Sequence, residues 1–224
     1  TAPGMLLREP YGRDTVPIEA FDYDEKVDGT EHGRYLWGNA VWALAARITN
    51  SFAKYSWCAT IRGVESGGLV EGLPVHNFRT DSGELVMKCP TETPITDRRE
   101  KELADLGFIP LVHAKGTDKA AFFSVQSTQK PKVYDKDSAT ANSRVSAQLP
   151  YIFPVSRFAH YLKAMMRDKI GGYTSKDEMT TFLNNWIGNY VVSNDSASFS
   201  VKAQKPLKEA RIDVVEIPGK PGAF

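Results

Sequence analysis

The sequence predicts a mixed α/β fold in which a central mixed sheet is flanked by helices. Two observations lead to this prediction. Apolar residues recur at three- and four-residue spacing in several long segments, which is typical of amphipathic helices. Shorter apolar runs, bounded by Gly, Pro and Asp, lie between these segments and favour strands. With 224 residues, the chain is long enough to bury a substantial core.

The chain is expected to begin with an arm and to continue as an α/β domain. Residues 1–34 are rich in Pro, Gly, Asp and Glu and show little helical periodicity, so they are predicted to form an arm or linker. Residues 35–224 are predicted to form the domain, either undivided or as two subdomains of about 35–135 and 136–224.

Helices are predicted at five places, from apolar periodicity and from the signals that begin and end helices. Ser175 and Glu178 have the spacing of a capping box, in which each side chain bonds the backbone N–H of the other residue. Asp97 and Glu100 have the same spacing, with Asp97 as the cap. Proline at 150 and 154 is expected to interrupt the helical pattern, because proline lacks an N–H donor and clashes with the preceding turn. The predicted helices cover residues 35–55, 97–106, 137–149, 154–170 and 176–191.

Strands are predicted from the short apolar runs. Two of them are expected to form a hairpin across Asp81-Ser82-Gly83. The last run, Glu209–Ile217, alternates in strand fashion and is followed by a turn without a returning strand. Because an unpaired edge exposes backbone donors and acceptors, we expect either a truncation before the final strands or a strand completed by another chain. The other predicted strands cover residues 57–62, 73–78, 84–89, 108–113 and 120–125.

The composition argues against nucleic-acid and membrane partners. The chain has 28 Lys and Arg residues against 27 Asp and Glu residues, so its formal net charge of +1 gives no basic footprint. No apolar run reaches the roughly 20 residues that a membrane helix needs. The two cysteines, Cys58 and Cys89, lack CxxC or metal-ligand spacing. Buried thiols in a reducing compartment are therefore favoured over a disulfide or a nucleophile.

The sequence contains no catalytic or cofactor-binding motif. The glycine-rich run 63–68 lacks the spacing of a nucleophile elbow, and no phosphate-binding loop occurs. The enzyme alternative is a hydrolase that uses Asp14, His32 or Ser66, but nothing in the sequence ties these residues together, and we predict no enzyme and no cofactor.

Metal binding is also not favoured. No two of the four histidines, His32, His76, His113 and His160, are spaced as a helical metal pair. An acidic group in the arm has carboxylates for a hard cation, but its spacing does not match an EF-hand loop. A solvated segment, or one that pairs with a basic partner, is favoured instead. The group consists of Asp22, Asp24, Glu25, Asp28 and Glu31.

Six blocks of the sequence together resemble one protein family. They are PYGRDTVPIEAFDYDE (10–25), YLWGNAVWALAARI (35–48), RGVESGGLVEGLP (62–74), CPTETPITDRREKELADLGFIPLVH (89–113), RFAHYLKAMMRDKIG (157–171) and PGKPGAF (218–224). In this order they are similar to the large contractile-sheath subunit of the bacterial type VI secretion system, known as the TssC, VipB or EvpB family. The resemblance covers most of the chain and corresponds to the C-terminal half of that subunit.

The resemblance implies a contractile-sheath-like domain with a mechanical role. It implies a cytoplasmic subunit that pairs with a small sheath subunit and polymerises with neighbouring sheath subunits in a membrane-anchored apparatus. The sheath surrounds an inner tube of hexameric rings on a baseplate and ejects this tube by contraction. A recycling AAA+ ATPase, rather than the sheath, spends ATP. The alternative is a module that binds a peptide strand or partner without a mechanical role.

Two candidate interfaces follow from the resemblance. Residues 211–217 are expected to join a sheet that is shared with a neighbouring subunit, and the candidate residues are Arg211, Ile212, Asp213, Val214 and Val215. By a weaker analogy with contractile tails, the polar side of the helix 176–191 is expected to face the inner tube, through Lys176, Asp177, Asn184 and Asn185. An ordinary solvated helix face is the equal alternative.

Overall fold

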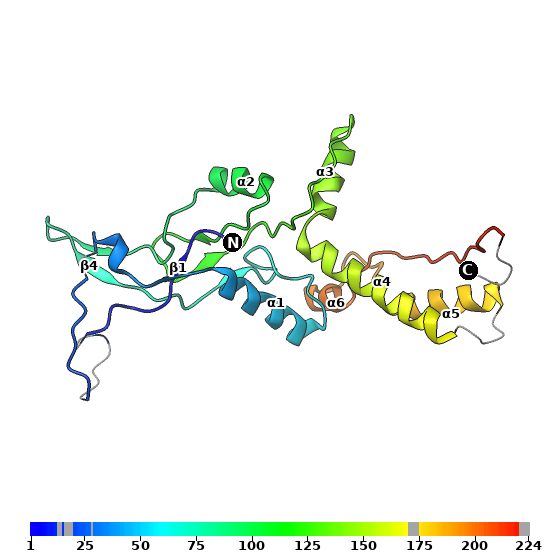
Figure 1. The fold of residues 1–224 in the computed structure, drawn as a ribbon, viewed down its shortest axis with the longest axis horizontal. Coiled ribbons are helices and arrows are strands. Elements are labelled where there is room, and N and C mark those ends of the chain that lie inside the picture. Colours follow the sequence, from blue (N-terminus) through cyan, green and yellow to red (C-terminus); the bar gives the residue numbers. More distant parts are fainter. Residues whose placement is uncertain (13–14, 16–19, 28, 170–174, 220–224) are drawn as a thin grey trace. The chain divides into compact units, whose positions relative to one another are not determined.

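The computed structural model describes residues 1–12, 15, 20–27, 29–169 and 175–219. Within these residues the chain forms six α-helices, one 3-10 helix and seven short strands (Figure 1). The chain divides into two compact units. Unit 1 combines Thr1–Asn50 with Thr60–Leu149, and unit 2 combines Ser51–Ala59 with Pro150–Phe224.

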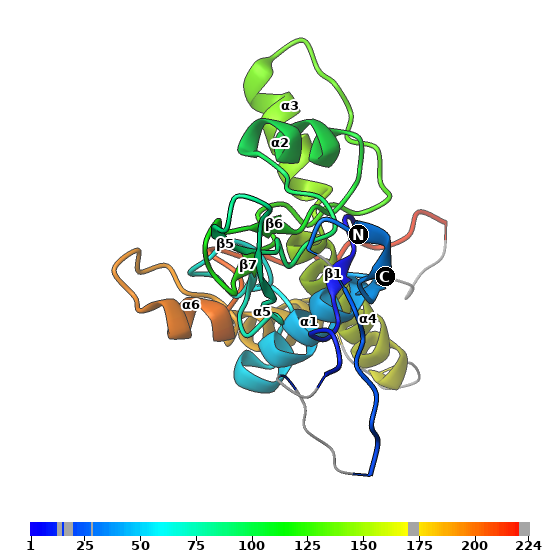
Figure 2. The ribbon, with the colours of Figure 1, turned by 90° about the vertical axis from the view of Figure 1, so that its left-hand side faces the viewer.

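The strands belong to unit 1 and pair only with antiparallel neighbours in the described part of the chain. The predicted mixture of helices and strands is confirmed, but the strands are distributed over three small sheets rather than gathered in one central mixed sheet. Figure 2 shows β6 and β7 side by side. The sheets are β1 (Met5–Leu6) with β2 (Trp37–Gly38), then β3 (Leu69–Val70), β7 (Ala120–Ala121) and β6 (Val112–His113) in this order, and the hairpin of β4 (Asn77–Arg79) and β5 (Leu85–Met87).

In the core of unit 1, the backbone of Phe122 is hydrogen-bonded to the glycine-rich loop 63–68. Phe122 is fully buried, its N–H donates to the Gly68 carbonyl at 3.0 Å, and its own carbonyl accepts the Gly63 N–H at 2.7 Å. A side chain at Gly68 would collide with the Phe122 carbonyl, so this close backbone approach requires glycine. The other large residues of this core with under 2% exposure include Leu6, Ile61, Leu111 and Val125.

Two helices of the first half begin differently from the prediction. Helix α1 (Val41–Tyr55) starts six residues later than expected, because Trp37 and Gly38 pair with β1 and the Asn39 side chain accepts the Val41 N–H at 2.9 Å. Helix α2 (Asp97–Asp105) has Thr96 at its N-cap without a side-chain bond, so the predicted Asp97 capping box is wrong. The carboxyl group that would complete the box belongs to Glu100, which is buried instead. The other elements of this half are η1 (His32–Arg34) and α3 (Asp137–Ser146).

The predicted break between two helices is present, but it lies at residues 147–148, and helix α4 (Leu149–Lys169) runs through both prolines. Pro150 lies in the first turn, where the missing N–H has no partner inside a helix anyway. Pro154 removes one further helical bond, and its ring is buried. The lost hydrogen bond is offset by the apolar contact that the ring makes in the interior.

Unit 2 is built around an aromatic cluster, with α5 (Lys176–Gly188) and α6 (Phe199–Gln204) as its further helices. The rings of Trp57 and Phe158 stack with their centroids 4.8 Å apart, and the Arg157 guanidinium lies 4.5 Å from the Trp57 ring centroid. Trp57 therefore belongs to the hydrophobic core of unit 2, and the predicted strand 57–62 is not formed. The aromatic cluster consists of Trp57, Phe158 and Ile187, with Trp186, Tyr190, Leu207 and Ile212 packed against them.

The capping box predicted for α5 is confirmed. The Ser175 hydroxyl accepts the Glu178 N–H at 3.3 Å, and the Glu178 carboxylate accepts the Ser175 N–H at 2.9 Å. These bonds satisfy N–H groups that have no partner inside the helix. The bond from the Ser175 N–H, followed by an interaction with the Ser175 hydroxyl, lowers the pKa of Glu178, because donors to the carboxylate favour its charged form.

Candidate partner interface

The candidate segment 211–217 has no regular secondary structure in the described chain. Figure 1 shows it as a drawn-out run in orange to red. Ile212 and Val214 are half-buried, whereas Arg211, Asp213 and Val215 are exposed. This alternation is the period of two that a strand with one buried face would have. The segment thus has the side-chain alternation of the predicted strand, but in the described chain it forms no ladder of hydrogen bonds with a neighbouring strand.

The side chain of Asn184 holds the beginning of this segment. Its Oδ1 accepts the Ile212 N–H at 3.0 Å, and its Nδ2 donates to the Ile212 carbonyl at 2.7 Å. One amide side chain thus bonds both backbone groups of one residue, as a neighbouring strand would. Ile212 itself packs against the aromatic cluster. The segment is therefore fixed at residue 212 before it continues outward.

Beyond this anchor the backbone is unpaired. Among the described residues, the N–H and carbonyl groups of 213–217 form no hydrogen bond. The side chains of Val215 and Ile217 are 70% and 46% exposed, although both are apolar and β-branched. Unpaired backbone and exposed β-branched side chains are the two features that let a segment add to the edge of another sheet.

The four residues proposed to face an inner tube do not share one environment. Asn184 is half-buried and engaged with Ile212, so it does not belong to an open polar face. Lys176, Asp177 and Asn185 are exposed, and their side chains form no hydrogen bond or ion pair with the described residues. Asp177 lies in the first turn of α5, where the helix dipole favours a negative charge. An exposed surface of three residues thus remains available for a partner.

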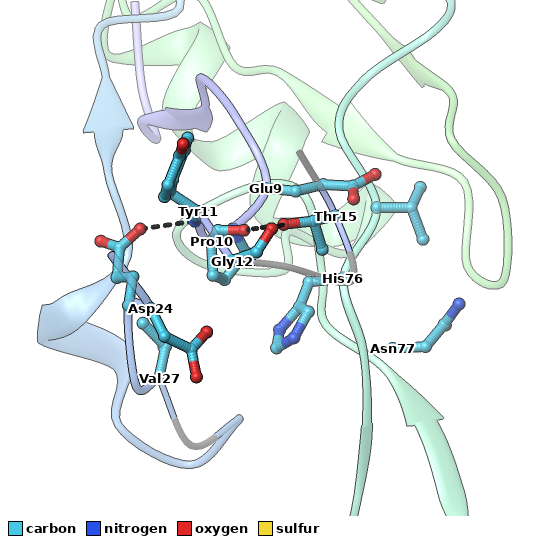
Figure 3. Close-up of a pocket in the computed structure, with 11 residues that line it drawn as sticks. Glu9, Pro10, Tyr11, Gly12, Thr15, Asp24, Val27, His76 and Asn77 are labelled. Carbon is cyan, nitrogen blue, oxygen red and sulfur yellow. Dashed lines mark hydrogen bonds between the residues drawn. The ribbon is translucent and has the colours of Figure 1, made fainter. Parts of the chain in front are cut away.

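A second feature is a polar cavity of about 450 Å³ between the arm and β4 in unit 1. Figure 3 shows Tyr11, Thr15 and His76 around it, and the Thr15 hydroxyl donates to the Pro10 carbonyl at 2.7 Å. The ring of His76 has its Nδ1 2.6 Å from the Tyr35 hydroxyl, and burial lowers the pKa of His76. Glu9, Asp24 and Asn77 also line the cavity.

The acidic group of the arm is partly neutralised rather than arranged around a cation. Glu25 lies 2.6 Å from Arg8 and accepts the Tyr11 N–H at 2.8 Å. The Arg8 hydrogen bond, followed by the Tyr11 bond, lowers the pKa of Glu25. Its contribution to stability is therefore present above the ordinary pKa of a glutamate and is lost as the pH falls through the lowered value. Glu31 pairs with Arg34 at 3.1 Å, and Asp28 lies outside the described residues.

The residues considered for chemistry are not brought together. Trp37 donates its indole N–H to the His32 carbonyl, and no hydrogen bond joins His32 to Ser66 in the described part of the chain. Asp14 lies outside that part. No group of three metal-ligating side chains occurs among the described residues. Cys58 and Cys89 are free thiols, as predicted, but both are partly exposed rather than buried.

Within the described ranges, no helix has both the length and the apolar character to cross a bilayer.

Two family models match the chain, one on each side of a short gap. The model described as "EvpB/VC_A0108, tail sheath N-terminal domain" matches residues 1–129. The model described as "EvpB/VC_A0108, tail sheath gpW/gp25-like domain" matches residues 138–224. Together they cover nearly the whole chain, and both describe tail sheath proteins.

A curated relative supports the same family. The chain is 52% identical, over 225 aligned residues, to the type VI secretion system sheath protein TssC1 of Pseudomonas aeruginosa. The alignment covers 100% of this chain and 45% of the relative, so the chain spans less than half of that protein's length. The resemblance seen in six sequence blocks is thereby confirmed, and the chain belongs to the VipB/EvpB family of type VI secretion tail sheath proteins.

Proposed function

We propose that this chain acts as a structural part of a type VI secretion sheath and that residues 213–217 add a strand to a sheet of a neighbouring sheath subunit. The observation that carries the second half of this proposal is the unpaired, alternating segment behind the Asn184 anchor. Asn184 fixes where the added strand begins, so less conformational entropy is lost when a partner binds. The exposed Val215 supplies an apolar contact in the new sheet.

Strand addition suits a contractile lattice. Main-chain hydrogen bonds persist while the side-chain surfaces of subunits slide past one another, so neighbours stay connected as the lattice changes shape. The energy of contraction then comes from new contacts between subunits, and no bond-making chemistry is needed. The sheath part therefore has no enzymatic activity, cofactor or metal, and ATP is spent by a recycling AAA+ ATPase.

The partners follow from this role. The chain assembles with a small sheath subunit and with neighbouring copies, around an inner tube of hexameric rings and on a baseplate. It works in the bacterial cytoplasm and needs neither nucleic acid nor membrane insertion. Its even charge balance of 28 basic and 27 acidic residues agrees with the absence of an anionic polymer among these partners.

Negative-stain microscopy tests this function. The full-length protein that contains this chain is expressed together with the small sheath subunit and the inner-tube protein. A sheath subunit gives long tubes, whereas a module that only binds a peptide strand gives discrete complexes of fixed size. Discrete complexes alone would contradict the proposed mechanical role.

The exposed polar surface of α5 gives a separate prediction. Reversing both charges, with Lys176→Glu and Asp177→Lys, is expected to impair assembly around the inner tube, because both side chains are exposed and free to meet a charged partner. The pair Lys163→Glu and Asp168→Lys, which also reverses one charge of each sign at exposed positions of unit 2, serves as the control. Equal co-sedimentation of the inner tube with both double variants would reject the tube-facing role of Lys176 and Asp177.

A further inference from the structure

The thiol of Cys89 faces a histidine in unit 1. Cys89 follows β5, and His113 ends β6, 24 residues further along the chain. The Cys89 Sγ lies 3.4 Å from His113 Nδ1, within hydrogen-bonding distance for sulfur. A sulfur nucleophile and a nitrogen base are therefore in direct contact at a place where sequence spacing gave no sign of a pair.

The other nitrogen of the ring fixes its proton arrangement. His113 Nε2 lies 2.7 Å from the Thr117 carbonyl oxygen. A carbonyl only accepts, so Nε2 carries the hydrogen, and Nδ1 of the neutral ring is left to accept the thiol proton. The carbonyl is held by a tight turn, in which Thr117 donates its N–H to Ala114 at 3.1 Å and Gly116 has a φ of 78°. Thiol, base and orienting carbonyl form the arrangement that activates a nucleophilic cysteine.

A second polar group also lies against the sulfur. The buried Thr91 hydroxyl lies 3.2 Å from Cys89 Sγ and 3.3 Å from the Thr93 carbonyl, so its hydrogen has the sulfur as one of two acceptors. The ammonium of the adjacent Lys88 lies elsewhere, since its Nζ donates to the Gly29 carbonyl at 3.0 Å and is 4.9 Å from the Tyr35 ring centroid. A hydroxyl donor beside the sulfur stabilises the negative charge that develops on it during nucleophilic attack. Because Cys89 is partly exposed, a small reagent can reach it.

We infer that Cys89 is a modification site at which small disulfides form a mixed disulfide with the chain. As the Cys89 sulfur attacks one sulfur of the small disulfide, His113 Nδ1 takes the thiol proton. The disulfide bond of the reagent breaks, and a new S–S bond to Cys89 forms. The leaving sulfur carries away the electron pair as a thiolate, and the imidazolium releases its proton to solvent or, where the leaving thiolate is basic, to the leaving sulfur. Cys89 is oxidised, and the small disulfide is the oxidant.

The second cysteine provides an internal comparison. Cys58 is also partly exposed, but burial raises the pKa of its thiol, with only a partial opposing effect of Arg157. A raised thiol pKa leaves less thiolate at neutral pH, and the thiolate is the form that reacts. Cys58 is therefore expected to react more slowly than Cys89.

The test uses dithiobis(nitrobenzoate), an aromatic disulfide that releases a coloured thiolate on reaction. In a Cys58→Ser background, the rate constant for Cys89 is measured with and without His113→Gln. We expect His113→Gln to slow the reaction by at least about tenfold, a conservative part of the ~100-fold or more that general-base assistance contributes. His160→Gln, the same change at an exposed histidine of unit 2, is the control and leaves the rate unchanged. Equal rates for a folded His113→Gln chain and its parent would overturn the proposal.

A measurement on the unaltered chain covers the case in which His113→Gln does not fold. The chain is treated with less than one equivalent of the reagent, and the two cysteine peptides are compared by mass spectrometry. Labelling of Cys89 ahead of Cys58 supports the proposal, and equal labelling or labelling of Cys58 first contradicts it. Neither measurement requires sheath assembly, so its result does not depend on the proposed function.

Discussion

Replacing Val215 by proline is expected to abolish sheath assembly and to leave the stability of the unassembled chain unchanged. Proline removes the backbone N–H, and in a sheet this loses a ladder bond. In the unassembled chain the Val215 N–H has no described partner, so nothing is lost there. Its side chain is 70% exposed, so little packing is lost either. The substitution thus tests the role of the added strand in assembly without disturbing the fold of the unassembled chain.

Val215→Ala is the matched control, because it shortens the side chain and keeps the N–H. It is expected to assemble into tubes, which are counted by negative-stain microscopy alongside the proline variant. Urea unfolding of the isolated chains should agree within about 0.5 kcal/mol, as is usual for exposed positions. Normal tubes from Val215→Pro would remove this segment from the assembly mechanism.

A Phe158→Ala substitution is expected to lower the free energy of unfolding of unit 2 by about 3–5 kcal/mol, the usual range for a buried phenylalanine. Phe158 is 6% exposed. Its ring stacks on Trp57 and meets Tyr190 edge-on, with centroids 5.4 Å apart. Removing it leaves a cavity at the centre of the aromatic cluster, against which Ile212 also packs. The loss is measured by urea unfolding, followed by tryptophan fluorescence.

Phe182→Ala serves as its control. Phe182 lies on α5 but is 42% exposed, and its described ring contact is with the Lys169 ammonium at 5.1 Å from the ring centroid. Its loss is expected to cost about 1 kcal/mol or less. If the two variants were equally stable, the aromatic cluster would not be the centre of unit 2.

Sequence reasoning succeeded where a structure depends on residues close together in the chain. The capping box of Ser175 and Glu178 lies within four residues, and the helix behind it forms, although it ends at Gly188 rather than at residue 191. The hairpin β4–β5 is likewise a local structure, with its turn at Asp81-Ser82-Gly83. Predictions from local sequence signals failed where the burial of a side chain competes with those signals. Glu100 has the right spacing to complete a cap but is drawn into the interior, and Pro154 stands inside α4 as a buried ring.

The remaining errors come from contacts that sequence spacing does not show. Trp57 begins an apolar run that reads as a strand, but its stacking on Phe158, about 100 residues away, decides its place. The run 209–217 has a strand pattern but no neighbouring strand in the described chain, and a strand without a ladder is not stable. The residues of this segment predict that buried and exposed side chains alternate, but they do not predict which strand the segment pairs with.

The same reason explains what was missed in the candidate interface. Asn184 was assigned to an open polar face, because its place on α5 is known from the sequence but its bonds to Ile212, 28 residues away, are not. The contact of Cys89 with His113 also depends on how two sheets are folded together. The family resemblance gave the family correctly, whereas these contacts needed the structure.

Hydrogen exchange at the backbone amides of residues 213–217 tests the central claim most directly. The chain is measured alone and in assembled sheaths, and the Ile212 amide, already bonded to Asn184, is the internal reference. We predict fast exchange at 213–217 in the chain alone and exchange slowed by at least about 100-fold in the sheath, because the amides become part of a ladder. Exchange at 213–217 that is equally fast in both states would contradict strand addition.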